Sequence, residues 1–149
     1  MDQYALGIDS ENEFIQWLEA VPRRIEHLEE IIGDEIALDR SISSLMALRS
    51  WLLSSFRDTK SIVSDEDHEV IRCCGAYIGE VFISQHGWQW KYIPDRRFIF
   101  RQFAIVIGRE GDELQYVAPE CEVTALLSNR DKKRGFCERL LNPDKHATP

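Results

Sequence analysis

Apolar residues recur at intervals of three and four in the first third of the chain, which is the period of an amphipathic helix. Ser10 followed by Glu13 has the spacing of a capping box and predicts the start of a first helix. Pro22 predicts a break, after which a second helix ends at Gly33. The residues expected to face inward in these two helices are Phe14, Trp17, Leu18 and Val21, followed by Ile25, Leu28, Ile31 and Ile32.

Two more helices are predicted, one from about Asp39 to Arg57 and one that is capped by Ser64 and ends at Gly87. The third helix has an inward stripe of Ile42, Leu45, Met46, Arg49, Leu52, Leu53 and Phe56. The fourth has an inward stripe of Val70, Ile71, Cys74, Tyr77, Ile78, Val81 and Phe82. Gly75 and Gly79 lie inside the fourth helix, on one face, and each costs about 1 kcal/mol relative to alanine. A pair of glycines at that cost predicts that another backbone element, such as the sheet or the third helix, crosses the fourth helix closely there.

After Gly87 the apolar period changes to two, which predicts strands. Residues 88–92 alternate, and residues 98–107 form a long run that is apolar on both faces and is therefore expected to be a central strand. Residues 108–113 are predicted as a polar hairpin connection, and residues 114–117 as a third strand. The economical topology is an antiparallel meander.

The remaining residues predict further helices. Pro119 opens one, a basic turn covers residues 129–134, and a last helix runs over residues 136–141. We therefore expect an α+β fold with about four N-terminal helices, a three-stranded antiparallel meander and C-terminal helices. Residues 1–141 are expected to form a single globular domain, and residues 142–149 a flexible tail.

Charge adds a division that the hydrophobic pattern does not show. The 149 residues include 26 acidic and 18 basic side chains, a net charge of −8. The balance is −10 over residues 1–69 and +2 over residues 70–149. The acidic balance argues against nucleic acid or an anionic membrane as the main partner, because both require a cationic surface. It favours a basic partner for the N-terminal half.

Targeting signals and catalytic motifs are not recognised. The first 14 residues contain acids but no Lys or Arg, and the longest apolar run is short, so we expect a cytoplasmic protein that does not bind membranes. A Cys-His pair from Cys73 or Cys74 with His27, His68 or His86 is disfavoured, because burial raises a thiol pKa. We expect no catalytic residue, no cofactor and no metal site.

Two acidic groups are the candidate partner-binding residues. The first is at the end of the second predicted helix and the second is at the start of the fourth. They consist of Glu26, Glu29, Glu30, Asp34 and Glu35, and of Asp65, Glu66 and Asp67. Their self-repulsion is offset if a cationic partner binds. The same spacing is also typical of a solvated helix face, and it is compatible with a carboxylate hydrolase site.

A basic, aromatic segment lies in the predicted sheet. Its residues are Lys91, Arg96, Arg97 and Arg101, interleaved with Trp88, Trp90, Tyr92 and Phe98. Such a mixture of cations and aromatic rings is compatible with the binding of single-stranded nucleic acid, whose bases stack on the rings. Alternation, however, places the tryptophans on the face that packs on the fourth helix. Nucleic acid is therefore not the expected partner.

Tyr77-Ile78-Gly79-Glu80-Val81, followed by Gly87-Trp88-Gln89-Trp90, resembles a group of small bacterial α+β domains. Their hallmark is an aromatic-x-Gly-Glu-Val helix that leads into a Gly-x-Trp strand, and some are immunity proteins of polymorphic or contact-delivered toxins. The resemblance covers some 15 residues of the chain. It implies a protein that neutralises a toxin by binding it, with Gly79 allowing close packing and Glu80 held near the sheet.

The expected function is therefore that of an immunity protein, a stoichiometric inhibitor of a toxin or effector with a basic surface. A secretion chaperone or adaptor that holds a partner through the N-terminal helices is an alternative from another class. A hydrolase with an unrecognised carboxylate site is a further one. The sequence leaves the oligomeric state and the identity of the partner open.

Overall fold

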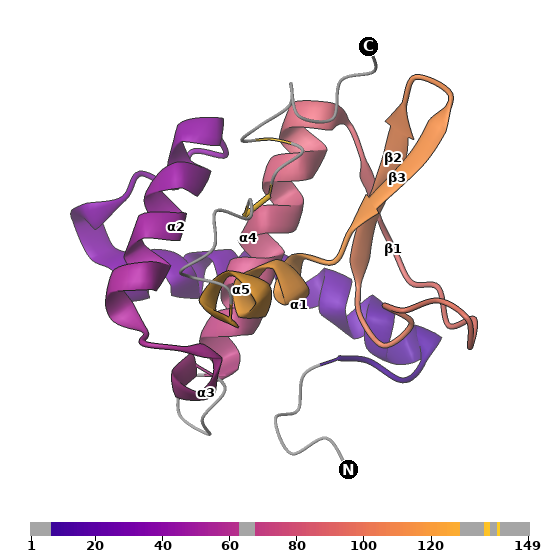
Figure 1. Ribbon diagram of the computed structural model, residues 1–149, viewed down its shortest axis with the longest axis horizontal. Helices are drawn as coiled ribbons and strands as arrows, with labels where there is room; N and C mark the ends of the chain where they lie inside the picture. Colours follow the sequence, from indigo (N-terminus) through magenta and orange to yellow (C-terminus); the bar gives the residue numbers. More distant parts are fainter. Residues whose placement is uncertain (1–6, 63–67, 129–135, 138–139, 141–149) are drawn as a thin grey trace.

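Helices and a small sheet are arranged around one central helix (Figure 1). The computed structural model describes residues 7–62, 68–128, 136, 137 and 140. In this part of the chain helices precede the strands and one helix follows them, which confirms the α+β class and its element order. The elements are α1 (Glu11–Ile32), the 3-10 helix η1 (Gly33–Glu35), α2 (Ile42–Ser55), α3 (Thr59–Ile62), α4 (His68–His86), β1 (Gln89–Lys91), β2 (Ile105–Glu110), β3 (Glu113–Val117) and α5 (Pro119–Ser128).

The first helix begins as predicted. The Oγ atom of Ser10 accepts a hydrogen bond from the backbone N–H of Glu13 at 3.1 Å. The Glu13 carboxylate in turn accepts one from the backbone N–H of Asp9 at 2.8 Å. This reciprocal pairing satisfies two donors at the helix start.

The predicted break at Pro22 is wrong, because α1 continues through it to Ile32. Its buried stripe keeps one helical phase on both sides of the proline: Phe14, Trp17, Val21, Ile25, Leu28 and Ile32. Burial of this continuous stripe outweighs the roughly 3 kcal/mol that an internal proline costs. Leu18 and Ile31 were expected to face inward but are 36% and 39% exposed. The helix ends at Gly33, as predicted, with φ 67°.

The second helix, α2, is capped by Ser41, whose Oγ accepts from the backbone N–H of Ser44. It is shorter than the predicted third helix, and its buried face differs. Leu45, Leu48 and Leu52 are fully buried, whereas Ile42 and Met46 are 39% and 59% exposed. Successive residues of a helix are about 100° apart around its axis. With Leu48 buried, the centre of the buried face lies on the side of the helix that points away from Met46. The short helix α3 was not predicted.

The central helix, α4, packs against α1, α5 and β2. All seven residues of its predicted stripe are buried. It ends as predicted at Gly87, which has φ 72° and donates its N–H to the carbonyl of Ile83 at 2.8 Å. The predicted cap Ser64 lies outside the described residues.

The sheet is an antiparallel meander in the order β1-β2-β3, with β2 in the centre. The predicted strand over residues 98–107 is only partly correct, because residues 98–104 form turns and the strand starts at Ile105. The apolar side chains of this segment pack in an aromatic cluster and do not belong to a strand. The centre of the Phe98 ring lies 5.0 Å from that of the Tyr116 ring. The hairpin turn is also later than predicted, because β2 continues through Gly108 to Glu110. The predicted third strand is confirmed as β3.

The sheet docks on α4 through tryptophans. The Trp90 ring occupies the space that a Cβ at Gly79 would need, and its Nε1–H donates to the Glu80 carboxylate at 3.0 Å. Trp88 stacks on Phe82 with ring centroids 5.2 Å apart. The close approach predicted at Gly79 is thus present, but it is made by the side chain of Trp90 and not by the backbone of another element. The inward orientation of the tryptophans is confirmed as well, since Trp88 is buried and Trp90 is partly buried against the core.

The C-terminal part of the chain is described only in places. Pro119 opens α5 as predicted. Phe136, Cys137 and Leu140, from the predicted last helix, are buried in the core. The basic turn and the tail lie outside the described residues, so the division of the chain at residue 141 stays a prediction. No helix in the described ranges has the length and apolarity needed to cross a membrane.

Candidate functional site

The first acidic group predicted from the sequence lies at one end of α1. Five exposed carboxylates on the last turns of this helix and on η1 form what we call the α1 acidic surface: Glu26, Glu29, Glu30, Asp34 and Glu35. They are exposed because α1 turns Ile25, Leu28 and Ile32 toward the core, so the polar positions between them face outward. The structure therefore brings these five residues together on successive turns.

The α1 acidic surface is poorly neutralised within the described residues. Glu30 has one partner, His27, whose Nδ1 lies 3.8 Å from the carboxylate, and both side chains are largely exposed. The carboxylates of Glu26, Glu29, Asp34 and Glu35 form no ion pair with any described residue. The surface therefore carries negative charge that the fold itself leaves largely uncompensated.

The position of these carboxylates on α1 is also unfavourable. Glu29 and Glu30 lie in the last turn, which contains no basic residue. The C-terminal end of a helix carries partial negative charge, so a carboxylate there costs about 0.3–1 kcal/mol. The α1 acidic surface thus reduces the stability of the helix that carries it.

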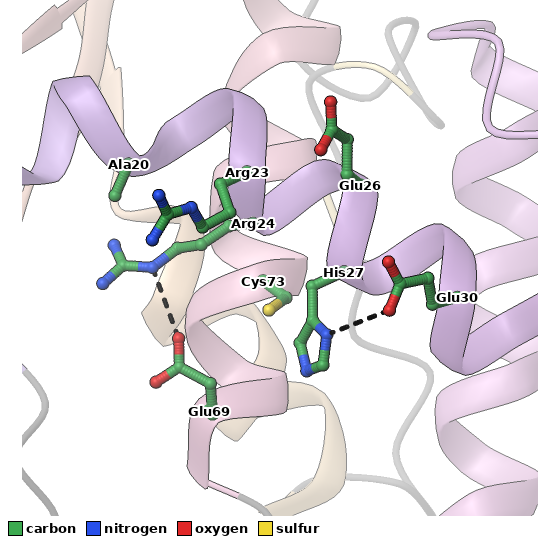
Figure 2. Close-up of a pocket in the computed structure, with 8 residues that line it drawn as sticks. All are labelled: Ala20, Arg23, Arg24, Glu26, His27, Glu30, Glu69 and Cys73. Atoms are coloured by element: carbon green, nitrogen blue, oxygen red, sulfur yellow. Dashed lines mark ion pairs between the residues drawn. The ribbon is translucent and has the colours of Figure 1, made fainter.

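A pocket of about 330 Å³ adjoins the α1 acidic surface, between α1 and α4 (Figure 2). Its lining comprises Ala20, Arg23, Arg24, Glu26, His27, Glu30, Glu69 and Cys73. Glu26 and Glu30 belong both to this lining and to the α1 acidic surface. Glu26 and Glu30 lie toward one end of the pocket and Arg23 and Arg24 toward the other, where Glu69 pairs with Arg24, so the pocket has a mixed charge.

Arg24 ties the basic end of the pocket to the core. Its Nε lies 3.4 Å from the Glu69 carboxylate on α4, and its guanidinium lies 4.7 Å from the centre of the Trp17 ring (Figure 2). Its Nη1 is buried without a hydrogen-bond partner in the described structure. Arg24 is therefore a structural link between α1 and α4 at the wall of the pocket.

Cys73 and His27, which were considered as a Cys-His pair, both line this pocket. Burial, and secondly the nearby Glu69 carboxylate, raise the pKa of the Cys73 thiol to about 11. A thiol with that pKa is protonated at neutral pH and is a poor nucleophile. Burial likewise raises the pKa of Cys74. The pair therefore lacks an activated cysteine.

Sequence reasoning missed Glu120, which is only 4% exposed at the start of α5. Burial raises the pKa of its carboxyl to about 7, although Arg72, Arg24 and the backbone N–H of Gly7 favour the charged form. One of its oxygens, Oε2, has no hydrogen-bond partner among the described residues. The only sequence signal was Gly75, because a Cβ there would lie 2.8 Å from Cγ of Glu120. The second predicted close crossing is thus made by α5.

The second acidic group, Asp65, Glu66 and Asp67, lies outside the described residues, so its place relative to α1 stays a prediction. In residues 7–62 and 68–128, no group of three or more His, Cys, Asp or Glu side chains is arranged to hold a metal ion. Comparisons of the chain with family models, with curated proteins and with solved structures found no match. The α1 acidic surface and its pocket are therefore interpreted from their own geometry.

Proposed function

We propose that this chain is an immunity protein, which binds a toxic bacterial effector with a basic surface and inhibits it stoichiometrically through the α1 acidic surface. One observation carries the proposal. Carboxylates that form almost no ion pairs with the described residues lie at the negative end of a helix dipole, where they lower the stability of α1. A cationic partner relieves both the mutual repulsion and the unfavourable dipole interaction.

The surroundings of the α1 acidic surface suit a protein partner. Ile31 is 39% exposed among the carboxylates and offers an apolar anchor. The adjoining pocket offers a recess beside Glu26 and Glu30 for a side chain of the partner. Charge then speeds association, whereas the buried anchors slow dissociation.

The test is co-expression of this chain with the product of the adjacent gene, followed by co-purification and a measurement of growth. We expect a stable complex of equal stoichiometry, and growth that depends on this chain when the neighbouring product is toxic. An adaptor or chaperone predicts a complex with a non-toxic secreted protein. A hydrolase predicts turnover that does not depend on any partner.

Charge reversal tests the assignment of the surface. Glu29→Lys/Asp34→Lys is expected to raise the Kd of the complex by roughly 100-fold at low salt, because close interfacial charge pairs are worth a few kcal/mol. Adding Glu30→Lys and Glu35→Lys is expected to weaken binding further. The measurement is isothermal titration calorimetry at several salt concentrations.

The matched control is Glu19→Lys/Asp112→Lys, which changes the net charge equally at exposed positions away from the α1 acidic surface. This control is expected to retain most of the affinity. The thermal stability of the Glu29→Lys variant is expected to equal or exceed that of the parent, because the dipole penalty is removed. Equal affinities of the two double variants would disprove the assignment of the interface.

A further inference from the structure

The face of the sheet that points away from α4 is formed by alternate residues. Trp90, Val106 and Val117 are paired across the strands on the face toward α4. Neighbouring residues of a strand point to opposite faces of the sheet. The residues that alternate with Trp90, Val106 and Val117 therefore lie on the face that points away from α4. These residues are Gln89, Lys91, Ile105, Ile107, Arg109, Leu114 and Tyr116.

Aromatic and aliphatic side chains gather on this outer face. Tyr116 contacts the rings of both Phe98 and Phe100, with centroids 5.0 and 6.1 Å apart. Ile99, between the two phenylalanines, is 74% exposed, and Leu114 is 56% exposed. We call these five residues the sheet-face patch. Large apolar side chains grouped at such exposure mark an interaction surface rather than a solvated one.

Basic side chains flank the residues of the sheet-face patch in the sheet register and along the chain. Residues 88–109 contain five of them and a single acid, Asp95. By register Lys91 and Arg109 share the outer face. The other three, Arg96, Arg97 and Arg101, are exposed in the turns that carry Phe98 and Phe100, and Arg97 is paired with Asp95 at 3.5 Å. An apolar centre with a cationic rim complements an acidic partner.

We propose that the sheet-face patch binds an acidic polypeptide segment that carries apolar side chains. A polypeptide fits better than single-stranded nucleic acid, because the most exposed side chains, Ile99 and Leu114, are aliphatic and give bases no ring to stack on. This surface is distinct from the α1 acidic surface and does not depend on the proposed immunity function.

The test uses a fluorescent random copolymer of glutamate and tyrosine, with binding to the whole chain measured by anisotropy at low salt. We expect saturable binding that weakens as salt is added. Leu114→Glu and Arg101→Glu are each expected to weaken it about tenfold or more, because they remove an apolar anchor and a rim cation. Met46→Glu and Lys60→Glu are matched controls, since both residues are exposed on other helices. These controls are expected to bind as the parent does.

Circular dichroism of every variant separates loss of binding from loss of fold. The proposal is overturned if the copolymer does not bind, or if the patch variants and the controls bind it equally. It is also overturned if a labelled oligothymidylate binds as tightly as the copolymer, which would assign the patch to nucleic acid. Dimerisation of the parent that Leu114→Glu abolishes would assign it to a second copy of this chain.

Discussion

Glu120 lies in an environment that its residue type does not predict. A carboxyl group at the start of a helix is normally exposed and charged, but this one is buried beside Gly75 and near Arg72. Arg72 in turn donates from Nη2 to the carbonyl of Gly7 at 3.2 Å. The pair therefore connects α4, α5 and the segment that precedes α1.

Glu120 makes stability depend on pH. Folding raises the pKa of its carboxyl from 4.5 to about 7, so the folded chain binds more protons than the unfolded chain between these values. The contribution of Glu120 to stability is therefore fully present below pH 4.5 and is lost as the pH rises to about 7. The loss amounts to about 3 kcal/mol. Urea unfolding of the parent and of Glu120→Gln across this range measures it.

Because the amide of Glu120→Gln does not titrate, the variant is expected to lose less stability than the parent between pH 4.5 and 7. Other titrating groups are common to both proteins and cancel in the difference. Parallel stability curves would show that folding does not raise the pKa of Glu120.

At the scale of elements, α1 shows how a global pattern overrides a local one. Pro22 is an exposed residue inside a helix of 22 residues and leaves the carbonyl of Leu18 without its usual intrahelical partner. The helix persists because hydrophobic burial on the opposite side extends across the proline. The cost of the proline is therefore still present in the folded chain and can be recovered.

Pro22→Ala is expected to stabilise the protein by about 1–3 kcal/mol. Alanine restores one backbone hydrogen bond, while the gain is reduced by the greater freedom of the unfolded chain. The readout is the midpoint of denaturant unfolding. Pro94→Ala, in an exposed segment without regular structure, is the control and is expected to give no such gain. Destabilisation by Pro22→Ala would mean that the proline stabilises α1.

Elements were predictable where burial follows a single period and no proline interrupts the pattern. The stripe of α4 and the two residues that end helices, Gly33 and Gly87, are of this kind. Prediction failed where an apolar run is compatible with two structures, a strand or a turn whose side chains pack in a cluster, as in residues 98–104. The spacing of apolar residues along the chain does not show that the aromatic rings of this segment contact Tyr116. The α1 acidic surface was predictable from spacing alone. The pocket and Glu120 were not, because they depend on how α4 meets α1 and α5.

At the scale of the whole molecule, the two proposed surfaces lie far apart (Figure 1). The N-terminal half of α1 lies against the sheet, where Phe14 stacks on Tyr92 and Trp17 contacts Trp90. The opposite end of α1, beside α2 in Figure 1, carries the acidic surface.

Buried thiols report on the integrity of this arrangement. All four cysteines are free, and Cys73, Cys74 and Cys137 are buried. Cys121 is partly exposed, but burial raises its pKa to about 12. A thiol reagent such as DTNB is therefore expected to react slowly with the native chain at pH 8 and with all four thiols in guanidinium. One fast equivalent in the native chain, lost in Cys73→Ser, would show that the pocket opens and exposes a reactive thiol.

The docking of Trp90 on Gly79 limits how the sequence can change during evolution. While Trp90 covers this position, no side chain can be accepted at residue 79, and Glu80 is held by the indole N–H. The three residues therefore constrain one another, whereas the carboxylates at the far end of α1 are exposed and are not under this constraint. Descendants of one ancestor that have diverged to meet different partners would still be recognisable by glycine, glutamate and, after nine further positions, tryptophan.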